Sequence, residues 1–218
     1  MVASGADATT IHYGRNDKRL EPDTLLLMDA GCELWGYSSD VTRTWPVSGR
    51  FTPAQRRVYS HVLEAHKACV AACGPGATLR DVHALSTTLL ADAMHDLGIR
   101  DHGGGRLPPG GYRDFYPHSV GHYLGLDTHD VSLVPQDSPL KPGCVLTIEP
   151  GLYLPRSPRV PEEFWGIGVR IEDDVVVDPS GAHVLSAAAP VEVDAVEALV
   201  GTRMEEWRAM TAFAAPRL

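Results

Sequence analysis

Two acidic residues, Asp29 and Asp40, lie eleven positions apart on either side of a glycine-containing turn. Asp29 ends an apolar run that starts at Leu25, and Asp40 opens a second run that continues to Trp45. These two runs predict a β-hairpin. Burying a carboxylate without a partner is costly, and Arg43 is one cation for two anions. A divalent metal ion would offset both charges, but this stretch alone favours a solvated hairpin with exposed acids.

Three histidines, His118, His122 and His129, fall within twelve residues and alternate with glycines and apolar residues. On a helix, His118 and His122 would share one face, as in a zinc site. Pro117 and Gly121 disfavour a helix, and the sequence has no H-E-x-x-H motif. We therefore expect an irregular loop that presents separate histidines to a pocket.

Two more carboxylates interrupt apolar strand-like runs. Glu149 follows an apolar run and precedes Pro-Gly, and Glu172 lies two positions after Arg170 in the run 166–177. That spacing places Arg170 and Glu172 on the same face of a strand. Each acid alone is equally consistent with a charge at the surface end of a strand. The repetition of this pattern, together with the histidine loop, favours one shared site.

The shared site would contain four carboxylates and one imidazole: Asp29, Asp40, His122, Glu149 and Glu172. An oxygen-rich set suits Mn²⁺, Co²⁺ or Fe²⁺ better than a structural zinc with thiolate ligands. Four anions leave excess negative charge around one divalent ion, so we expect two ions about 3.5 to 4 Å apart. Such a pair lowers the pKa of a bridging water and polarises a carbonyl oxygen, which is the chemistry of metal-assisted hydrolysis.

An amphipathic helix is predicted after the hairpin. Thr52 and Gln55 form a capping-box pattern, and apolar residues recur at steps of three and four to about Cys73. His61 and His66 fall in this helix without acidic partners at metal-ligand spacing. We expect both histidines at the surface.

Other helices and strands are predicted from glycine and proline residues that end them and from the periodicity of apolar residues. A second helix is predicted over 78–98, followed by a glycine- and proline-rich connector at 101–114. The stretch 9–13, rich in β-branched and aromatic residues, predicts a strand that carries His12. A last helix is expected over about 190–210.

Composition bounds the class of protein. The chain has 218 residues, 44% hydrophobic and 22% charged, which fits one large globular domain or at most two small ones. Its net charge of −9 argues against a nucleic-acid partner. No apolar run is long enough to span a membrane, so we expect a soluble protein without a membrane partner. The four cysteines form no C-x-x-C pair, and Cys69 and Cys73 are expected in the core.

The motifs and their order also resemble a known family. The chain contains, in order, D-x₁₀-D, G-H-x-x-G-x-x-x-H-D, T-I-E-P-G-x-Y and G-V-R-I-E-D-D. This series resembles the pita-bread metallopeptidases, most closely the aminopeptidase P (Xaa-Pro aminopeptidase) group. The run T-R-T-W-P-V at 42–47 looks most like the branch of Xaa-Pro aminopeptidase 3 and intermediate-cleaving peptidase.

The resemblance covers nearly all of residues 1–200 and implies their fold. It implies an α+β domain of the creatinase/aminopeptidase type, in which helices cover a curved antiparallel sheet. Residues 1–200 would be this catalytic domain and 201–218 a C-terminal helical extension or tail. Compared with the family pattern, the N-terminal domain and the first helix and strand of the catalytic domain are expected to be largely missing here.

The resemblance also implies a role for each ligand. Asp29 would bind one metal ion, Asp40 and Glu172 would bridge both ions, and His122 with Glu149 would complete the other. Two divalent ions are implied, with Mn²⁺ as the leading candidate.

Further roles concern the substrate. Glu149 would also carry a proton from the attacking water to the leaving proline nitrogen, while His118 and His129 would position the scissile carbonyl and stabilise the oxyanion. His12 would contact the residue after the scissile bond. Substrate-binding or supporting positions are implied for Tyr153 and Arg170.

The implied activity is release of an N-terminal residue that precedes proline, from peptide substrates with proline second. Prolidase-type dipeptide hydrolysis and a non-catalytic, peptide-binding module remain as alternatives. The resemblance leaves a homo-oligomer open and points to a mitochondrial or cytoplasmic protein, without a transit peptide in this chain.

Overall fold

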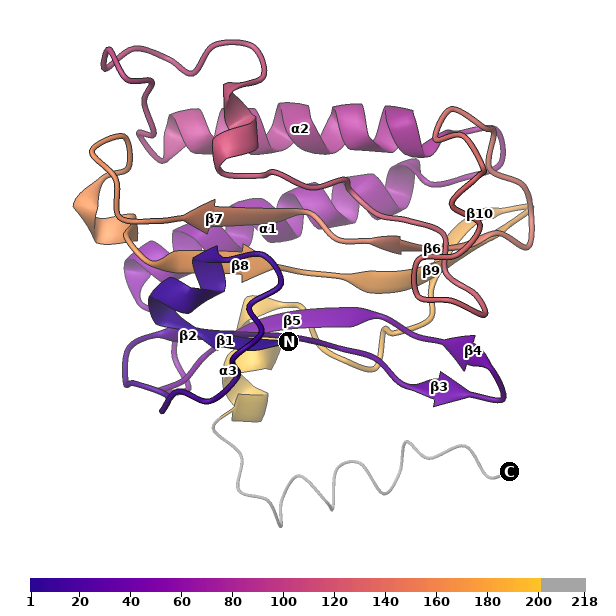
Figure 1. The fold of residues 1–218 in the computed structure, drawn as a ribbon, viewed down its shortest axis with the longest axis horizontal. Coiled ribbons are helices and arrows are strands. Elements are labelled where there is room, and N and C mark those ends of the chain that lie inside the picture. The colour runs from indigo at the N-terminus through magenta and orange to yellow at the C-terminus, as the bar shows by residue number, and fades with distance from the viewer. Residues whose placement is uncertain (201–218) are drawn as a thin grey trace.

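Antiparallel strands with two long helices packed on one side make up the part of the protein that the structure, a computed structural model, describes, residues 1–200 (Figure 1). This is the predicted α+β class. The strands are β1 (Val2–Ser4), β2 (Leu25–Ala30), β3 (Glu33–Leu34), β4 (Tyr37–Ser38), β5 (Val41–Pro46), β6 (Val145–Ile148), β7 (Gly151–Leu154), β8 (Ile167–Arg170), β9 (Asp173–Asp178) and β10 (Gly181–Val184). The helices are α1 (Pro53–Ala72), α2 (Leu79–Asp96) and α3 (Val193–Val200), with short 3₁₀ helices at Gly5–Thr9, Gly111–Asp114 and Glu162–Phe164.

The predicted hairpin is confirmed. β2 and β5 pair antiparallel, with Asp29 opposite Thr42, and the small pair β3–β4 extends the tip. The two arms approach closely at Gly31, where a Cβ atom would lie 1.8 Å from the carbonyl oxygen of Ser39. Only glycine fits there, so the turn brings Asp40 back level with the end of β2.

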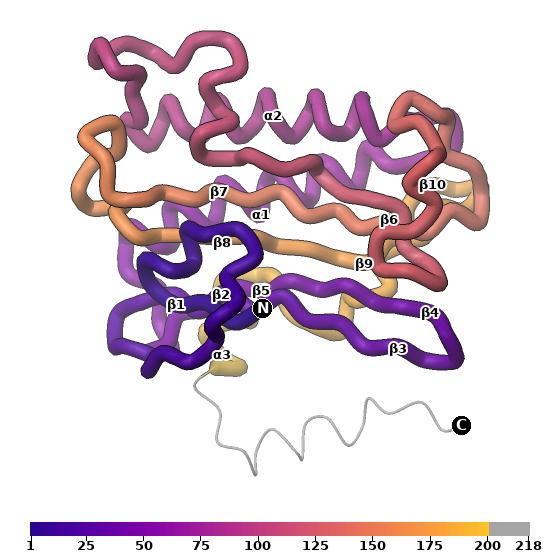
Figure 2. The backbone as a smooth tube through the Cα atoms, viewed as in Figure 1, coloured from indigo at the N-terminus to yellow at the C-terminus, as the bar shows by residue number. Residues whose placement is uncertain are grey.

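Figure 2 shows a second, longer ribbon formed by β6, β7, β8 and β9. This ribbon carries the other two acids. β6 continues into β7, β8 continues into β9, and the two arms pair antiparallel with Ile148 opposite Asp173 and Gly151 opposite Arg170. Counting inward along both arms places Glu149 opposite Glu172. Glu172 was predicted to share a strand face with Arg170, but the run is interrupted between Arg170 and Asp173, so Glu172 lies outside both strands. The interruption falls where the arms present these two carboxylates.

Both predicted helices form, the first with its predicted capping box. The Thr52 hydroxyl accepts a hydrogen bond from the Gln55 amide at 3.2 Å, and the Gln55 side chain accepts one from the Thr52 amide at 2.9 Å. The Thr78 hydroxyl caps α2 by accepting from the Asp81 amide at 3.1 Å. Within residues 1–200, no helix is both long and apolar enough to cross a membrane.

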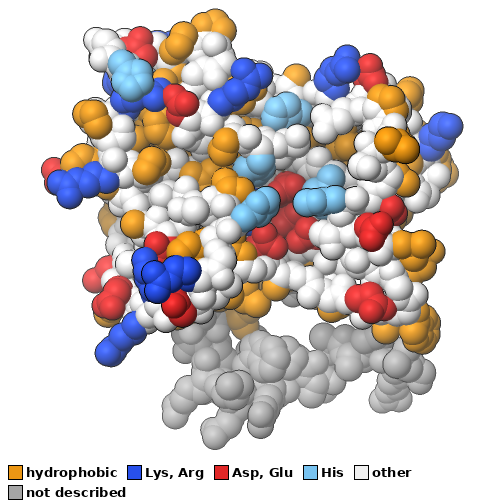
Figure 3. Space-filling view, in the orientation of Figure 1, with side chains coloured by type: hydrophobic (Ala, Val, Ile, Leu, Met, Phe, Trp, Pro, Cys, Tyr) orange, Lys and Arg blue, Asp and Glu red, His pale blue; other side chains and the backbone are white. Residues whose placement is uncertain are grey.

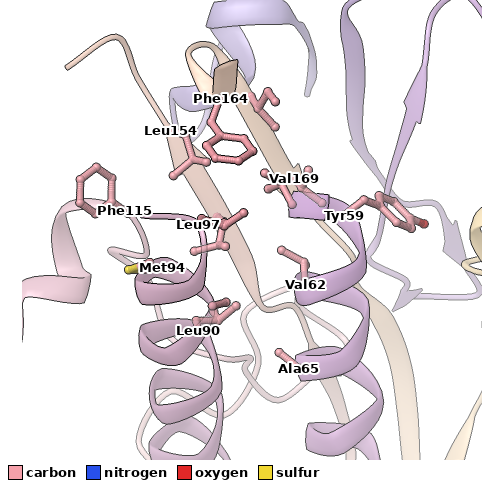
Figure 4. Packing of buried hydrophobic residues seen from close by; sticks show 14 of the residues in the cluster. Tyr59, Val62, Ala65, Leu90, Met94, Leu97, Phe115, Leu154, Phe164 and Val169 are labelled. Carbon is pink, nitrogen blue, oxygen red and sulfur yellow. The ribbon is translucent and has the colours of Figure 1, made fainter. Parts of the chain in front are cut away.

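The helices support the ribbon through a buried apolar core. Figure 4 shows α1 and α2 meeting each other and the strands β7 and β8 through close-packed side chains: Tyr59, Val62, Ala65, Leu90, Met94, Leu97, Phe115, Leu154, Phe164 and Val169. A second buried cluster joins Cys69 and Cys73 of the α1 end to Leu146 and Ile148 of β6. The strands that lead to Glu149 are therefore held from behind on both sides of the break.

Three local expectations are corrected. Residues 9–13 do not form a strand, because the edge of β2 is already occupied by β1, and His12 lies in an exposed loop with a φ of 57°. His66 is not at the surface but is 3% exposed. The last described helix begins at Val193 rather than at about 190, and its predicted end and the predicted tail lie outside the described residues.

Thiol labelling tests this packing. Burial raises the pKa of the Cys69 and Cys73 thiols to about 12, whereas Cys32 is exposed. A thiolate-specific reagent at pH 8 should therefore label Cys32 in the native protein and reach Cys69 and Cys73 only after unfolding. Mass spectrometry of the native and urea-unfolded protein, with Cys32→Ser as the control, measures this; rapid native labelling of Cys69 would contradict the described core.

Candidate active site

The acids and histidines singled out in the sequence converge on one pocket between the hairpin and the ribbon. Nine of the ten predicted site residues line a cavity of about 310 Å³: His12, Asp29, Asp40, His118, His122, His129, Glu149, Arg170 and Glu172. The tenth, Tyr153, lies behind the cavity wall, hydrogen-bonded to His118 and Arg170. Figure 3 shows an acidic cluster in a hollow of this face, with histidines around it.

Glu149 and Glu172 form the inner pair of the site. Like charges directly opposite on paired strands destabilise a sheet, and both side chains are largely buried. Burial raises the pKa of Glu149 to about 7, although Arg170 and His122 act to lower it. Burial, together with the negative charges of Glu149 and Asp40, raises the pKa of Glu172 well above its usual value. Without a further positive charge, burial therefore favours the protonated form of both carboxylates.

His122 and Asp40 face the same point from the other side. His122 Nε2 lies 3.6 Å from Asp40 Oδ2 and 3.7 Å from Glu149 Oε1. His122 Nδ1 lies 3.0 Å from the Tyr123 carbonyl oxygen, so the ring donates its Nδ1 proton there and leaves Nε2 free as a ligand atom. Asp40, His122 and Glu172 each offer a ligand atom within 4.8 Å of the others.

A glycine explains how the histidine loop comes so close. At Gly121 a Cβ atom would lie 1.9 Å from the Thr147 carbonyl oxygen. The flanking backbone is bonded to the ribbon, since the Glu149 amide donates to the Val120 carbonyl at 2.7 Å and the Thr147 amide to the His122 carbonyl at 2.8 Å. The predicted irregular loop is thus confirmed, and it is pinned beside Glu149.

Asp29 is bound to a buried cation. Arg170 Nη2 donates to Asp29 Oδ2 at 2.5 Å, and Nη1 donates to the Tyr153 hydroxyl at 3.0 Å. Burial acts to lower the pKa of Arg170, but the neighbouring Tyr153, Glu172 and Asp29 raise it above its usual value. The guanidinium therefore stays charged and offsets one of the four carboxylates.

The three remaining histidines differ in exposure. His118 is partly buried, with Nε2 2.7 Å from the Tyr153 hydroxyl and Nδ1 2.8 Å from the Ser119 carbonyl oxygen. Burial lowers its pKa to about 4, so the ring is neutral at pH 7. His129 is exposed, and its ring centroid lies 4.3 Å from that of His122. His12 reaches the pocket from its exposed loop.

Arg43, the cation of the hairpin, does not form an ion pair with Asp29 or Asp40. Arg43 points away from the pocket and pairs with Asp173 at 2.6 Å, whereas the counter-charge of Asp29 is Arg170. Alternation along β5 explains this, because Thr42 and Thr44 occupy the buried face and Arg43 the opposite one.

Sequence reasoning missed two polar groups at the site. The Thr42 hydroxyl donates to Glu172 Oε2 at 2.5 Å, and Gln136 lines the pocket. Thr42 had a readable signal, since a threonine at every second position of a strand marks one face. Gln136 lies in the loop 131–137, whose path the sequence does not indicate.

The donor set fits divalent cations. Four carboxylates and one imidazole face about 310 Å³ of space, yet Arg170 is the one Lys or Arg among the residues that line it in the described part of the chain. Burial of these carboxylates, with the nearby negative charges as smaller causes, raises the pKa of Glu149 and Glu172. Oxygen donors with one histidine suit Mn²⁺, Fe²⁺, Co²⁺ or Zn²⁺ in a catalytic rather than a structural site.

The arrangement of helices on antiparallel strands, with this acidic cluster at the break of a ribbon, is that of the pita-bread fold. Residues 1–179 match the model of metallopeptidase family M24. The chain belongs to this family, as the motif order indicates.

Relatives and solved structures agree. The chain is 46% identical over 211 residues to intermediate cleaving peptidase 55, mitochondrial, of Arabidopsis thaliana, covering 97% of this chain and 42% of that protein. It is 44% identical over 198 residues to Homo sapiens Xaa-Pro aminopeptidase 3, and the match covers 90% of this chain and 39% of that protein. The structure of aminopeptidase P from Escherichia coli with the inhibitor Pro-Leu superposes on this chain with a TM-score of 0.86 at 39% identity. The match covers 92% of this chain and 46% of that structure's chain. The predicted branch is confirmed, and the chain spans about two fifths of the length of these curated relatives.

Metal binding should be linked to pH. In the metal-free protein the raised pKa of Glu149, about 7 against 4.5 when unfolded, means that the folded state binds more protons across this window, so stability falls as pH rises. Metal displaces those protons. At about 100 times the dissociation constant, Mn²⁺ should raise the Tm by about 5 to 10 °C near pH 7.5 and by less near pH 5.

Thermal unfolding with and without Mn²⁺ across this range measures the effect. Glu149→Gln is the control, because it removes one of the titrating groups and should flatten the pH dependence. A gain in Tm that is the same at pH 5 and pH 7.5 would contradict the assignment of Glu149 to the metal site.

Proposed function

We propose that residues 1–200 form the catalytic domain of a metal-dependent aminopeptidase that hydrolyses the bond between an N-terminal residue and a following proline. The observation that carries the proposal is the convergence of Glu149, Glu172, Asp40 and His122 on one half-buried point. Membership of family M24 and the names of the relatives support the reaction class. Because the chain spans only part of those relatives, the activity is proposed for this domain by itself.

Two divalent ions, Mn²⁺ in our proposal, would be held by the five predicted ligands. Asp29 would bind one ion, Asp40 and Glu172 would bridge both, and His122 with Glu149 would complete the second. When bound, the ions would supply a water of lowered pKa and polarise the scissile carbonyl.

Glu149 is the proposed proton carrier. Hydrolysis joins the water oxygen to the carbonyl carbon and breaks the carbon–nitrogen bond, so one proton must move from the water to the proline nitrogen. A carboxylate beside the attacking water can both take and release that proton, and Glu149 lines the pocket beside His122. Glu149 Oε2 also lies 3.9 Å from His118 Nδ1 and from Arg170 Nε.

The histidines would hold the substrate. His118 and His129 are proposed to orient the scissile carbonyl and the oxyanion that develops on it, and His12 to contact the residue after the scissile bond. Both nitrogens of His118 have protein partners, so substrate binding must replace the Tyr153 or the Ser119 contact. Tyr153 and Arg170 would then act mainly by supporting His118 and Asp29.

Hydrolysis of an Xaa-Pro-Xaa tripeptide tests the proposal. Metal-stripped protein should be inactive, and added Mn²⁺ should restore release of the first residue. Glu149→Gln should lower kcat by at least about 100-fold, the scale of a lost general base. Product formation measured by chromatography, with the Mn²⁺ content measured in parallel, gives both quantities.

The outcomes separate the hypotheses. Activity that depends on Mn²⁺ and is lost in Glu149→Gln supports the peptidase. Two metal ions per chain without hydrolysis would favour a peptide-binding module instead. No metal binding at all would overturn the ligand assignment.

Dipeptidase activity is the nearest alternative. The pocket adjoins a second cavity of about 600 Å³ along the hairpin, and the two share His12, Asp29, Asp40 and His129. That space can hold residues beyond the proline, which favours longer peptides. We expect kcat/KM for an Xaa-Pro-Xaa tripeptide to exceed that for the Xaa-Pro dipeptide at least about tenfold, a difference of about 1.4 kcal/mol. Faster hydrolysis of the dipeptide would favour the prolidase reaction.

A mitochondrial location and a homo-oligomer remain predictions. The Arabidopsis thaliana relative is mitochondrial by name, which supports that compartment. Size-exclusion chromatography with light scattering determines the oligomeric state.

A further inference from the structure

Asp40 and Glu172 are each anchored through the backbone by a neighbour that the proposed function does not use. These neighbours are Arg43 and Asp174, which lie outside the pocket lining. We propose that Arg43 and Asp174 are positioning residues of the metal site: Arg43 fixes the main chain of Glu172, and Asp174 fixes the main chain of Asp40. The inference rests on the proposed function only in taking Asp40 and Glu172 as metal ligands.

Arg43 joins three segments of the chain. Nη1 donates to the carbonyl oxygens of Thr42 at 2.9 Å and Glu172 at 2.6 Å, and Nη2 donates to Asp173 Oδ1 at 2.6 Å. Nε and Nη2 also reach the Ala189 carbonyl at 3.2 and 2.8 Å. All five N–H donors of the guanidinium therefore have acceptors. With only 12% of its side chain exposed, Arg43 has little freedom to move.

This contact completes the fixation of Glu172. Its amide donates to the Thr42 carbonyl at 3.1 Å, its carbonyl accepts from Arg43, and its carboxylate accepts from the Thr42 hydroxyl. These bonds tie the interrupted ribbon to β5 of the hairpin. Since Asp29 and Asp40 belong to the hairpin and Glu149 and Glu172 to the ribbon, the distance between the two pairs of carboxylates depends on this junction.

Asp174 fixes the main chain of Asp40. Both of its carboxylate oxygens accept from the Asp40 amide, at 3.2 and 3.3 Å. The residue is 6% exposed, and no salt bridge within residues 1–200 involves it. Burying a carboxylate without a cation is costly. The hydrogen bond from the Asp40 amide to Asp174 offsets part of that cost. The main chain of Asp174 is held separately, because its amide donates to the Ser186 hydroxyl at 3.1 Å.

The three consecutive acids Glu172, Asp173 and Asp174 thus make three different contacts. Glu172 faces the pocket, Asp173 binds Arg43, and Asp174 binds the Asp40 amide. Metal sites lose about 10- to 100-fold in affinity when the residues that orient their ligands are changed. The bond from Asp174 needs only an acceptor oxygen, which an amide also offers.

The test compares Mn²⁺ affinity by titration calorimetry in the wild type, Asp174→Ala and Asp174→Asn. Asp174→Ala should weaken Mn²⁺ binding about 10- to 100-fold. Asp174→Asn, whose side-chain oxygen can still accept from the Asp40 amide, should remain within about threefold of the wild type. Raising the Mn²⁺ concentration should restore the kcat of Asp174→Ala, with an unchanged KM for the tripeptide.

Matched controls come from the far end of the same strand. Asp178 lies at the end of β9 and contacts Ser180 and His183 at the surface. Asp178→Ala and Asp178→Asn should leave the dissociation constant of Mn²⁺ unchanged. Circular dichroism and the Tm of the metal-free proteins check folding. A merely structural role for Asp174 would lower the metal-free Tm without a selective loss of Mn²⁺ affinity.

Arg43→Lys is the second variant, chosen because it leaves Asp173 with a cation. A lysine cannot reach the Thr42, Glu172 and Ala189 carbonyls together, so Mn²⁺ affinity should again fall about 10- to 100-fold. Wild-type affinity in Arg43→Lys and Asp174→Ala would overturn the inference, as would an Asp174→Asn variant as weak as Asp174→Ala. A wild type that binds Mn²⁺ but hydrolyses no Xaa-Pro bond overturns the proposed function alone, and the affinity comparison still decides the positioning.

Discussion

Four carboxylates converge in one half-buried pocket, and this excess of negative charge is the constraint to which the surrounding structure responds. Glu149 and Glu172 meet directly across two paired strand arms, with Asp40 close by. The folded chain meets part of the cost itself, through the Arg170 cation and the Thr42 hydroxyl. The raised pKa of Glu149 and Glu172 shows that these contacts do not offset all of it.

The backbone presents these charges at places where regular pairing stops. Glu149 and Glu172 occupy the matching interruptions of the long ribbon, and Asp40 follows the turn of the hairpin. An interruption frees the side chains from the alternation of a strand, while the intact pairs on either side keep the arms in register. The apolar core behind the ribbon, shared with α1 and α2, prevents this break from becoming a hinge.

Local pattern predicted the hairpin, both long helices, a histidine loop facing a pocket, and one shared site for Asp29, Asp40, His122, Glu149 and Glu172. Each of these depends on signals that lie close together in the chain: apolar periodicity, capping residues and an acid at a strand end. The site roles of His12 and Arg170 came only from the family resemblance. The errors concern partners that are distant in sequence. His66 is buried because Asp173, 107 positions away, lies 3.1 Å from its ring, and Arg43 turns from the hairpin acids to the same residue. The edge of β2 is paired by β1 rather than by the stretch around His12. Two segments could pair with this edge, and apolar periodicity does not indicate which of them does.

Charge counting gives a reason for two ions rather than one. The four carboxylates contribute −4 and the buried Arg170 guanidinium contributes +1, which leaves −3 with His122 neutral. One divalent ion would reduce this to −1, a charge that repels an anionic nucleophile. Two would bring it to +1, which attracts that nucleophile and stabilises an oxyanion on the substrate. Arg170, by pairing with Asp29, would therefore set the sign of a pocket that holds two ions, although a hydrogen-bonded guanidinium cannot itself donate a proton to the reaction.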